Sequence, residues 1–325
     1  MSKVSARITR LRILQALSET RSRIKFTVAI LAVLVSGQDG YSQVTISNIG
    51  RVAPVGARAA ALGDGYVAEA TDAGDLFGNP ATLAYLAQPS VFMSHSIERK
   101  DEMMSENLAV AFPSSKMEAF GFGLSVAHTG YLKDSPRARV KMRIIQYLAT
   151  VGYAKGISSS LGVGGNLGVR YVESGGFRLG ELTPAVGLFY APSPEISYGL
   201  VYNDQGSPLQ FMYDSTSTSW KSEDPRRTLQ IGISLRLRLW RKDPTLTMAL
   251  ANEKVFRIDG LTYKGGIEFQ PVRQIAFRLA YFVAPDVVYA KYGVGLNLRP
   301  LRIDYAISPS HLSDRFHEIT AALSL

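Results

Sequence analysis

The chain has 325 residues, of which 46% are hydrophobic, and its mean hydropathy is +0.04. This composition is too polar for a bundle of transmembrane helices, since each helix needs about 20 consecutive apolar residues. The sequence contains no cysteine. That absence excludes a disulfide framework, a thiolate metal site and a cysteine-anchored lipoprotein.

Residues 1–42 predict a secretory signal peptide. Seven Lys and Arg residues lie in the first 25 positions, the apolar run 26–35 follows, and small residues around Ser42 suit cleavage. The apolar run is too short for a spanning helix, so we expect a signal rather than an anchor. These 42 residues hold seven basic and two acidic side chains, so their removal lowers the formal net charge from +9 to +4. The mature chain is then only mildly basic, and we expect no nucleic-acid partner.

Residues 43–89 are rich in alanine and glycine. Within them, residues 55–65 read VGARAAALGDG and residues 70–84 read ATDAGDLFGNPATLA. Asp72 can cap a short helix, and the Asn79-Pro80 step favours a turn. We therefore expect a compact segment without strands between the signal and the rest of the chain.

From residue 90 onwards the dominant pattern is an alternation of apolar and small or polar side chains with period two. Residues 229–239 alternate Leu or Ile with Gln, Gly, Ser and Arg, and residues 120–127 and 161–171 repeat the pattern with many glycines. The polar face of a soluble sandwich usually carries many Lys, Glu and Thr residues. A small, Gly-rich and Arg-bearing inner face with a long aliphatic outer face is typical of a membrane barrel.

The alternation predicts about fourteen strands, an even number as in bacterial single-chain barrels. They lie at 90–99, 106–113, 118–129, 141–155, 160–173, 182–191, 195–203, 227–239, 245–252, 263–270, 274–283, 288–298, 301–308 and 316–325. Connections after odd-numbered strands are long and polar, as at 131–140, 174–181, 204–226 and 253–262. The others are mostly short. The sequence therefore predicts an all-β fold, a transmembrane antiparallel β-barrel over residues 90–325, with long outer loops and tight inner turns.

The motifs of residues 55–84 together resemble the start of the FadL-like outer-membrane β-barrels, and most closely the PorV/PorQ family associated with type IX secretion. The shared elements are the Gly-Ala-Arg-Ala opening, the Leu-Gly-x-Gly step and the Asn-Pro-Ala-x-Leu turn. Residues 265–269, 277–281 and 301–306 resemble the last strands of that family. The chain departs from the family at Leu325, where an aromatic residue is usual. The resemblance implies a cell outer membrane location in a Gram-negative-type envelope.

A barrel of fourteen strands is too wide to be filled by its own inward side chains, so residues 43–89 are the candidate hatch or plug. The hatch motif residues are Arg58, Gly63, Gly65, Asp72, Asn79 and Pro80. We favour a role in folding the hatch over direct ligand contact. The expected lumen-facing polar residues are Arg170, Arg236, Arg238, Arg278, Arg302 and Asp304. They form salt bridges to the hatch or, alternatively, line a polar path.

Two functions without catalysis remain open. The resemblance implies a PorV/PorQ-like component of the type IX protein secretion machinery that binds or passes on secreted proteins. Its partners would be those proteins, other secretion components and outer-membrane lipid, and the loop 204–226 would be the contact surface. The alternative is a FadL-like channel for hydrophobic small molecules, which predicts an apolar pocket beside the hatch and a lateral opening in the wall.

A third hypothesis is a barrel lipid hydrolase that uses His311 and Ser313. No third orienting group accompanies this pair, so we assign no catalytic residue and expect no enzyme. His95, His128 and His317 lie far apart and lack the spacing of metal ligands. We accordingly expect neither a metal nor a cofactor.

Overall fold

The structure is a computed structural model. It describes residues 55–63, 65–98, 103–115, 117–128, 132–133, 141–142, 144–174, 177–205, 207–213, 226–239, 244–256, 259–284, 287–308 and 316–325. Within this part of the chain, no helix is both long and apolar enough to span a membrane.

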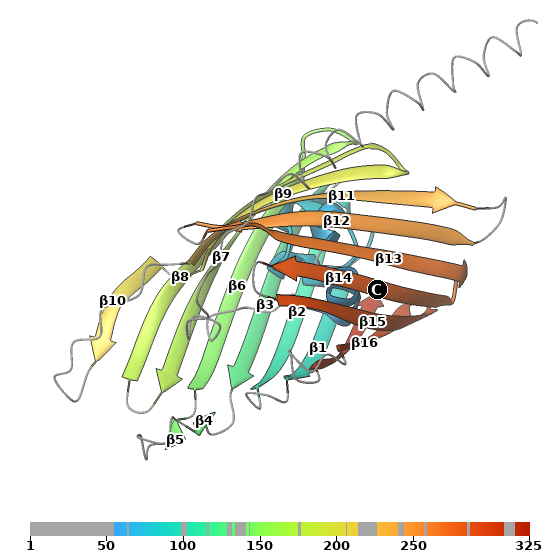
Figure 1. Ribbon diagram of the computed structural model, residues 1–325. Coiled ribbons are helices and arrows are strands. Elements are labelled where there is room, and N and C mark those ends of the chain that lie inside the picture. Colours follow the sequence, from blue (N-terminus) through green and yellow to red (C-terminus); the bar gives the residue numbers. More distant parts are fainter. Residues whose placement is uncertain are drawn as a thin grey trace, which may run out of the picture. The chain divides into compact units, whose positions relative to one another are not determined.

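Fourteen antiparallel strands form a closed barrel (Figure 1). In spatial order they are β8 (Phe177–Ser193), β7 (Leu161–Ser174), β6 (Ile144–Gly156), β3 (Glu118–His128), β2 (Met103–Ser115), β1 (Ser90–Glu98), β17 (Phe316–Ser324), β16 (Leu301–Ser308), β15 (Val287–Leu298), β14 (Ile275–Ala284), β13 (Thr262–Val272), β12 (Thr245–Val255), β11 (Arg226–Arg238) and β9 (Ile196–Gln205). The first strand pairs with the last, from Ser90↔Ser324 to Glu98↔Phe316. Pairing of β8 with β9 closes the ring. The predicted all-β barrel is confirmed.

Alternation along each strand decides which side chains face outward. On β3, Phe122 and Leu124 are 52% and 57% exposed, whereas Gly121 and Gly123 between them are buried. The same contrast separates exposed Ile231 from buried Gly232 on β11. Apolar side chains therefore cover the outside of the barrel, and small or polar ones face its interior.

Two predicted connections and the start of one predicted strand were wrong in detail. The predicted loop 174–181 is mostly strand, because β7 reaches Ser174 and β8 starts at Phe177. Part of the predicted loop 204–226 is β10 (Ser207–Tyr213), which pairs with β8. The start of the predicted strand 141–155 is instead β5 (Lys141–Met142), which pairs with β4 (Leu132–Lys133) in a separate small sheet. Backbone pairing does not require apolar side chains, so these polar stretches can form strands beyond the apolar belt.

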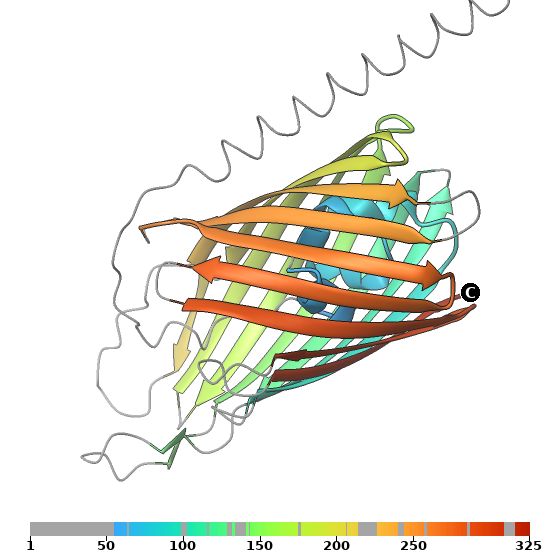
Figure 2. The ribbon, with the colours of Figure 1, turned by 45° about the vertical axis from the view of Figure 1, so that its right-hand side comes forward.

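Residues 55–63 and 65–86, here called the inner segment, fold into short helices inside the ring of strands (Figures 1 and 2). They are α2 (Ala57–Ala61), η2 (Gly65–Ala68), η3 (Ala73–Phe77) and η4 (Pro80–Tyr85). The side chain of Asp72 caps η3 by accepting a hydrogen bond from the Gly74 N–H at 2.7 Å. Asn79 caps η4 in the same way from the Ala81 N–H at 3.1 Å, and Pro80 follows at the first helical position, where no N–H is needed.

Candidate functional site

The inner segment touches the barrel wall along a belt of inward-facing glycines. At each of them an added Cβ atom would lie less than 3.0 Å from an atom of the inner segment. This glycine belt consists of Gly123, Gly152, Gly162, Gly164, Gly187, Gly199, Gly232, Gly266 and Gly293. The tightest case is Gly199 on β9, whose Cβ would lie 2.0 Å from the Val67 carbonyl oxygen. The belt runs over eight strands of the wall, so the inner segment is seated closely around most of the barrel's inner circumference.

Gly63 is the corresponding glycine on the inner segment. It has a φ of 70°, which favours glycine, and a Cβ there would lie 2.5 Å from the Gly265 carbonyl oxygen of β13. The backbone of Leu62 lies equally close to Gly266. Gly65 begins η2 immediately after this turn. The Leu-Gly-x-Gly step is therefore the point where the inner segment turns against the wall.

Charged side chains, most of them buried, connect the inner segment to strands β11, β13, β14 and β16. This charge cluster consists of Arg58, Glu69, Asp72, Arg236, Glu268, Arg278, Arg302 and Asp304. Arg58 Nη2 lies 2.6 Å from Glu69 Oε2, and its Nε lies 3.1 Å from Glu268 Oε2. The charge cluster thus begins within the inner segment and crosses to β13.

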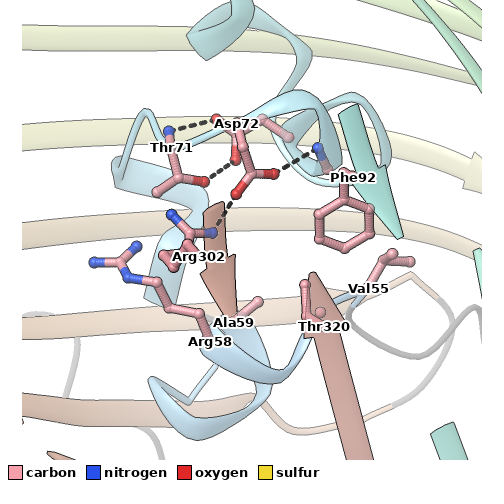
Figure 3. A pocket seen from close by; sticks show the side chains of 11 residues that line it. Val55, Arg58, Ala59, Thr71, Asp72, Phe92, Arg302 and Thr320 are labelled. Carbon is pink, nitrogen blue, oxygen red and sulfur yellow. Dashed lines mark hydrogen bonds and ion pairs between the residues drawn. The ribbon is translucent and has the colours of Figure 1, made fainter. Parts of the chain in front are cut away.

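The chain of ion pairs continues across the wall. Arg278 Nε lies 2.6 Å from Glu268 Oε2, and Arg278 Nη1 lies 2.7 Å from Asp304 Oδ1. Arg302 Nε lies 2.8 Å from Asp304 Oδ2, and the Arg302 guanidinium also binds Asp72 (Figure 3). The cluster therefore leaves the inner segment at Arg58 and returns to it at Asp72.

The environment keeps Arg58 and Glu69 of this cluster charged. Burial by itself would lower the pKa of Arg58, but Glu268 and Glu69 outweigh it and hold the pKa well above its ordinary value. Burial would likewise raise the pKa of Glu69, yet Arg58 and Arg236 hold it below its usual range. A buried ion is stable only when its partners and hydrogen bonds compensate for lost hydration. Each of these charges therefore depends on the others.

Asp75 is the buried carboxylate of the inner segment that has hydrogen bonds but no ion pair among the described residues. It accepts hydrogen bonds from the N–H and hydroxyl of Thr71, both at 2.7 Å, and from the Thr82 hydroxyl at 2.9 Å. Burial, together with the nearby Asp72 carboxylate, raises the pKa of Asp75 to about 7. Its charge therefore changes near neutral pH.

A small cavity with both polar and apolar lining lies beside these two carboxylates (Figure 3). Its volume is about 20 Å³, and its lining includes Arg58, Asp72, Asp75 and Arg302. A cavity of this size accommodates about one water molecule. It is not large enough for an organic ligand in this conformation.

The remaining expected lumen residues do not all reach the inner segment. Arg170 is buried against the wall and pairs with Glu181 on the adjacent strand, with Nε 2.6 Å from Oε2. Arg236 lies 3.5 Å from Glu69, and its side chain is half exposed. Arg238 is exposed near the end of β11.

Glu69 and Glu268, the carboxylates that bind Arg58, were not predicted from the sequence. The sequence around each of them nevertheless indicates a buried or inward-facing position. Glu268 follows the inward-facing Gly266 by two positions and is therefore inward as well, and Glu69 is an isolated acid in an otherwise apolar stretch.

Asn79 joins the inner segment to β8. Its side-chain amide donates to the Val67 carbonyl at 2.7 Å and to the Leu188 carbonyl of β8 at 3.0 Å. A Cβ at Gly187 would lie 2.1 Å from the Asn79 Oδ1 atom. The Asn79-Pro80 step is therefore in direct contact with this part of the wall.

The wall is irregular close to that contact. The register between β8 and β9 reaches Ala185↔Asn203, and the register between β8 and β10 resumes at Leu182↔Ser207. Neither register pairs Thr183 or Pro184 of β8 with a described residue of the facing chain. Pro184 also has no N–H to donate to a neighbouring strand. The backbone pairing of the closed sheet is therefore interrupted at this point.

No protein-family model matches the chain, and no curated protein sequence matches it. Solved structures share its fold. The Ralstonia pickettii toluene transporter TbuX has a TM-score of 0.59 at 14% identity, covering 86% of this chain and 98% of its own. The CymD monoaromatic hydrocarbon channel has a TM-score of 0.60 at 14% identity, covering 84% and 98%. A Pseudomonas aeruginosa FadL homologue has a TM-score of 0.56 at 9% identity, covering 84% and 99%. The chain therefore has the fold of the FadL-like 14-strand β-barrels.

Proposed function

We propose that the chain is an outer-membrane channel for small hydrophobic molecules, with the inner segment as a plug that closes the straight path through the lumen. The observation that carries the proposal is the shared fold, which extends over nearly the whole length of a toluene transporter and a monoaromatic hydrocarbon channel. The apolar outer surface supports a position in lipid, since side chains such as Phe122 and Leu124 would otherwise face water.

The glycine belt and the charge cluster support a plug that stays in place. A hydrophobic solute gains nothing by crossing a lumen of paired arginines and carboxylates, because those groups would lose their partners. The irregular pairing around Pro184 offers a sideways route through the wall instead. Asn79 of the plug is hydrogen-bonded to β8 at Leu188, four residues away, so the plug is fixed to the wall close to this site.

Uptake into proteoliposomes tests the proposal. Purified mature protein is reconstituted, and entry of a radiolabelled monoaromatic hydrocarbon and of a polar sugar of similar size is followed. We expect faster entry of the hydrocarbon than in protein-free vesicles and no faster entry of the sugar. Equal rates for both solutes would indicate a water-filled pore, and no increase for either would contradict a channel.

A second candidate is a PorV/PorQ-like role in type IX protein secretion. The tightly seated plug and its cavity of about 20 Å³ favour it, because a barrel that acts by binding partner proteins needs no open path. Its proposed contact surface is residues 204–226, of which 207–213 form β10. Deleting residues 214–225 in a host with the secretion machinery would then impair secretion while the barrel still folds. Normal secretion by this variant would contradict the role.

The residues named for the hydrolase hypothesis, His311 and Ser313, lie outside the described part of the chain. The names of the structures that share the fold describe transporters and channels. We therefore do not propose a hydrolase.

A further inference from the structure

One sector of the outer wall carries ionisable side chains where lipid-facing residues are expected. His95 on β1, Glu106 on β2, His128 on β3 and His317 on β17 all occupy outward positions of the alternation, as does Tyr305 on β16. We call these five residues the polar row. The outward orientation follows from their neighbours, since Ser94 and Ser96 on either side of His95 are buried, as are Phe316 and Glu318 around His317.

Strand registers place the members of the polar row close together. His95 pairs directly with Glu106, and its Nδ1 atom lies 2.9 Å from Glu106 Oε1. His317 pairs with Ile97, two residues along β1 from His95, and its Nδ1 atom lies 2.7 Å from the Tyr305 hydroxyl oxygen. The side chains of His95 and Glu106 are 43% and 50% exposed. Each ring uses Nδ1 for its contact, so Nε2 lies on the opposite side of the ring, where it can bind an outside partner.

The neighbouring sector shows that the polar row is not a continuous ring around the barrel. On β14 and β15 the outward side chains stay apolar up to the same end of the barrel, where Val283 pairs with Val288. A charged group exposed to lipid is costly, and polar groups on such a surface indicate a functional contact. The polar row therefore favours contact with a polar partner over contact with lipid tails.

A second copy of the chain supplies that partner by symmetry. In the sheet, β1 lies between β2 and β17. A two-fold axis parallel to the barrel axis and passing outside β1 places β2 of each copy opposite β17 of the other. Glu106 of one copy then faces His317 of the other, and the same contact forms again across the axis. The carboxylate on one side of β1 accepts hydrogen bonds, and the imidazole on the other side has a ring N–H that can donate one.

We propose that the protein forms a two-fold dimer in the membrane through the outward faces of β17, β1 and β2, with Glu106 of each copy bonded to His317 of the other. The proposal rests on the membrane location proposed above. Exposed apolar side chains on the same three strands, Met93, Leu108 and Ile319, would pack around these contacts. His95 would lie near the axis and would hold Glu106 in position through its existing contact.

Cysteine cross-linking tests the dimer, because the chain has no cysteine of its own. The variant His95→Cys would place two thiols near the axis, and Val169→Cys on β7, which is 51% exposed on another sector, is the control. Membranes containing either variant are oxidised and examined by gel electrophoresis. We expect a covalent dimer for His95→Cys and little for Val169→Cys. Equal yields from the two variants would overturn the proposal.

A second measurement tests the specific pairing. Two differently tagged copies, one carrying Glu106→Cys and the other His317→Cys, are produced together and cross-linked. We expect a mixed covalent dimer at several times the yield obtained when the Glu106→Cys copy is paired with Val169→Cys. Native mass spectrometry showing only monomers with bound lipid would contradict the dimer and indicate lipid head groups as the partner. Hydrocarbon uptake is measured on the same samples, so a monomer that still transports would overturn the dimer alone.

Discussion

Arg58 on α2 and Glu268 on β13 are joined by two hydrogen bonds of 3.1 and 3.2 Å, although 210 positions separate them in the sequence. Glu268 also accepts a hydrogen bond from Arg278 on the adjacent strand at 2.6 Å. Two guanidinium groups thus share one carboxylate at the boundary between the inner segment and the wall. The inner segment is held in the barrel by charge pairing in addition to close backbone packing.

Replacing Arg58 with methionine is expected to release the inner segment. Glu69 and Glu268 would remain buried without this partner, and breaking a buried ion pair costs about 3–5 kcal/mol. The measurement is denaturant unfolding of the detergent-solubilised protein, together with protease cleavage within residues 55–86. The exposed Arg238 gives a matched control, because Arg238→Met should change stability by no more than about 0.5 kcal/mol. Similar losses for both variants would show that the charge cluster does not hold the inner segment.

The glycine belt makes a separate prediction about packing. In Gly199→Ala the new methyl group would lie 2.0 Å from the Val67 carbonyl oxygen, so the inner segment must shift. Overpacking of this kind costs about 1–3 kcal/mol. Gly180→Ala on β8 is the control, because nothing lies within 4 Å of its added Cβ. Thermal unfolding followed by circular dichroism should show a lower Tm for Gly199→Ala only, and an unchanged Tm would mean that the inner segment fits loosely.

The barrel could be predicted from the sequence because one physical rule acts on every strand. Apolar side chains such as Phe122 and Leu124 face outward and small or polar ones face inward, so hydrophobicity repeats with period two and marks each strand. The strand β10 could not be found in this way. Its sequence, SPLQFMY, follows no clear alternation, and its pairing with β8 depends on backbone groups that any residue provides.

Only part of the charge cluster could be predicted from the sequence, and the reason is different. Arginines such as Arg278 and Arg302 stand out on an inward face, but their partners depend on which strands become neighbours and on where the inner segment lies. Glu268 contacts Arg58 only because the wall brings β13 against α2. Spacing in a sequence carries no information on such a contact between distant elements.

Asp75 predicts a pH dependence of stability. Burial and Asp72 raise the pKa of Asp75 in the folded protein to about 7, well above the value near 4 of an exposed aspartate. The folded state therefore binds this proton more tightly than the unfolded state does. The resulting stabilisation is complete below about pH 4, falls as pH rises towards 7, and is lost above that pH.

The variant Asp75→Asn should remove this dependence. We expect its free energy of unfolding, relative to the natural protein, to increase between about pH 4 and pH 7 and then to level off. Denaturant unfolding at unit steps of pH measures the difference. Asp259→Asn is the control, since Asp259 is exposed. A difference that stays constant with pH would show that Asp75 does not change its charge in this range.

Pro184 tests the proposed sideways route. In Pro184→Val the residue regains an N–H, and valine is well suited to a strand, so β8 can pair more continuously with the facing chain. If hydrophobic solutes pass through the irregular pairing at this position, their uptake into proteoliposomes should fall several-fold. The barrel itself should be unfolded no more easily than before. Pro192→Val provides the control, because Pro192 is exposed at the end of β8 beside the turn to β9 and should leave uptake unchanged. Full uptake by Pro184→Val would place the route elsewhere, and equal losses in both variants would point to a general effect of proline on β8.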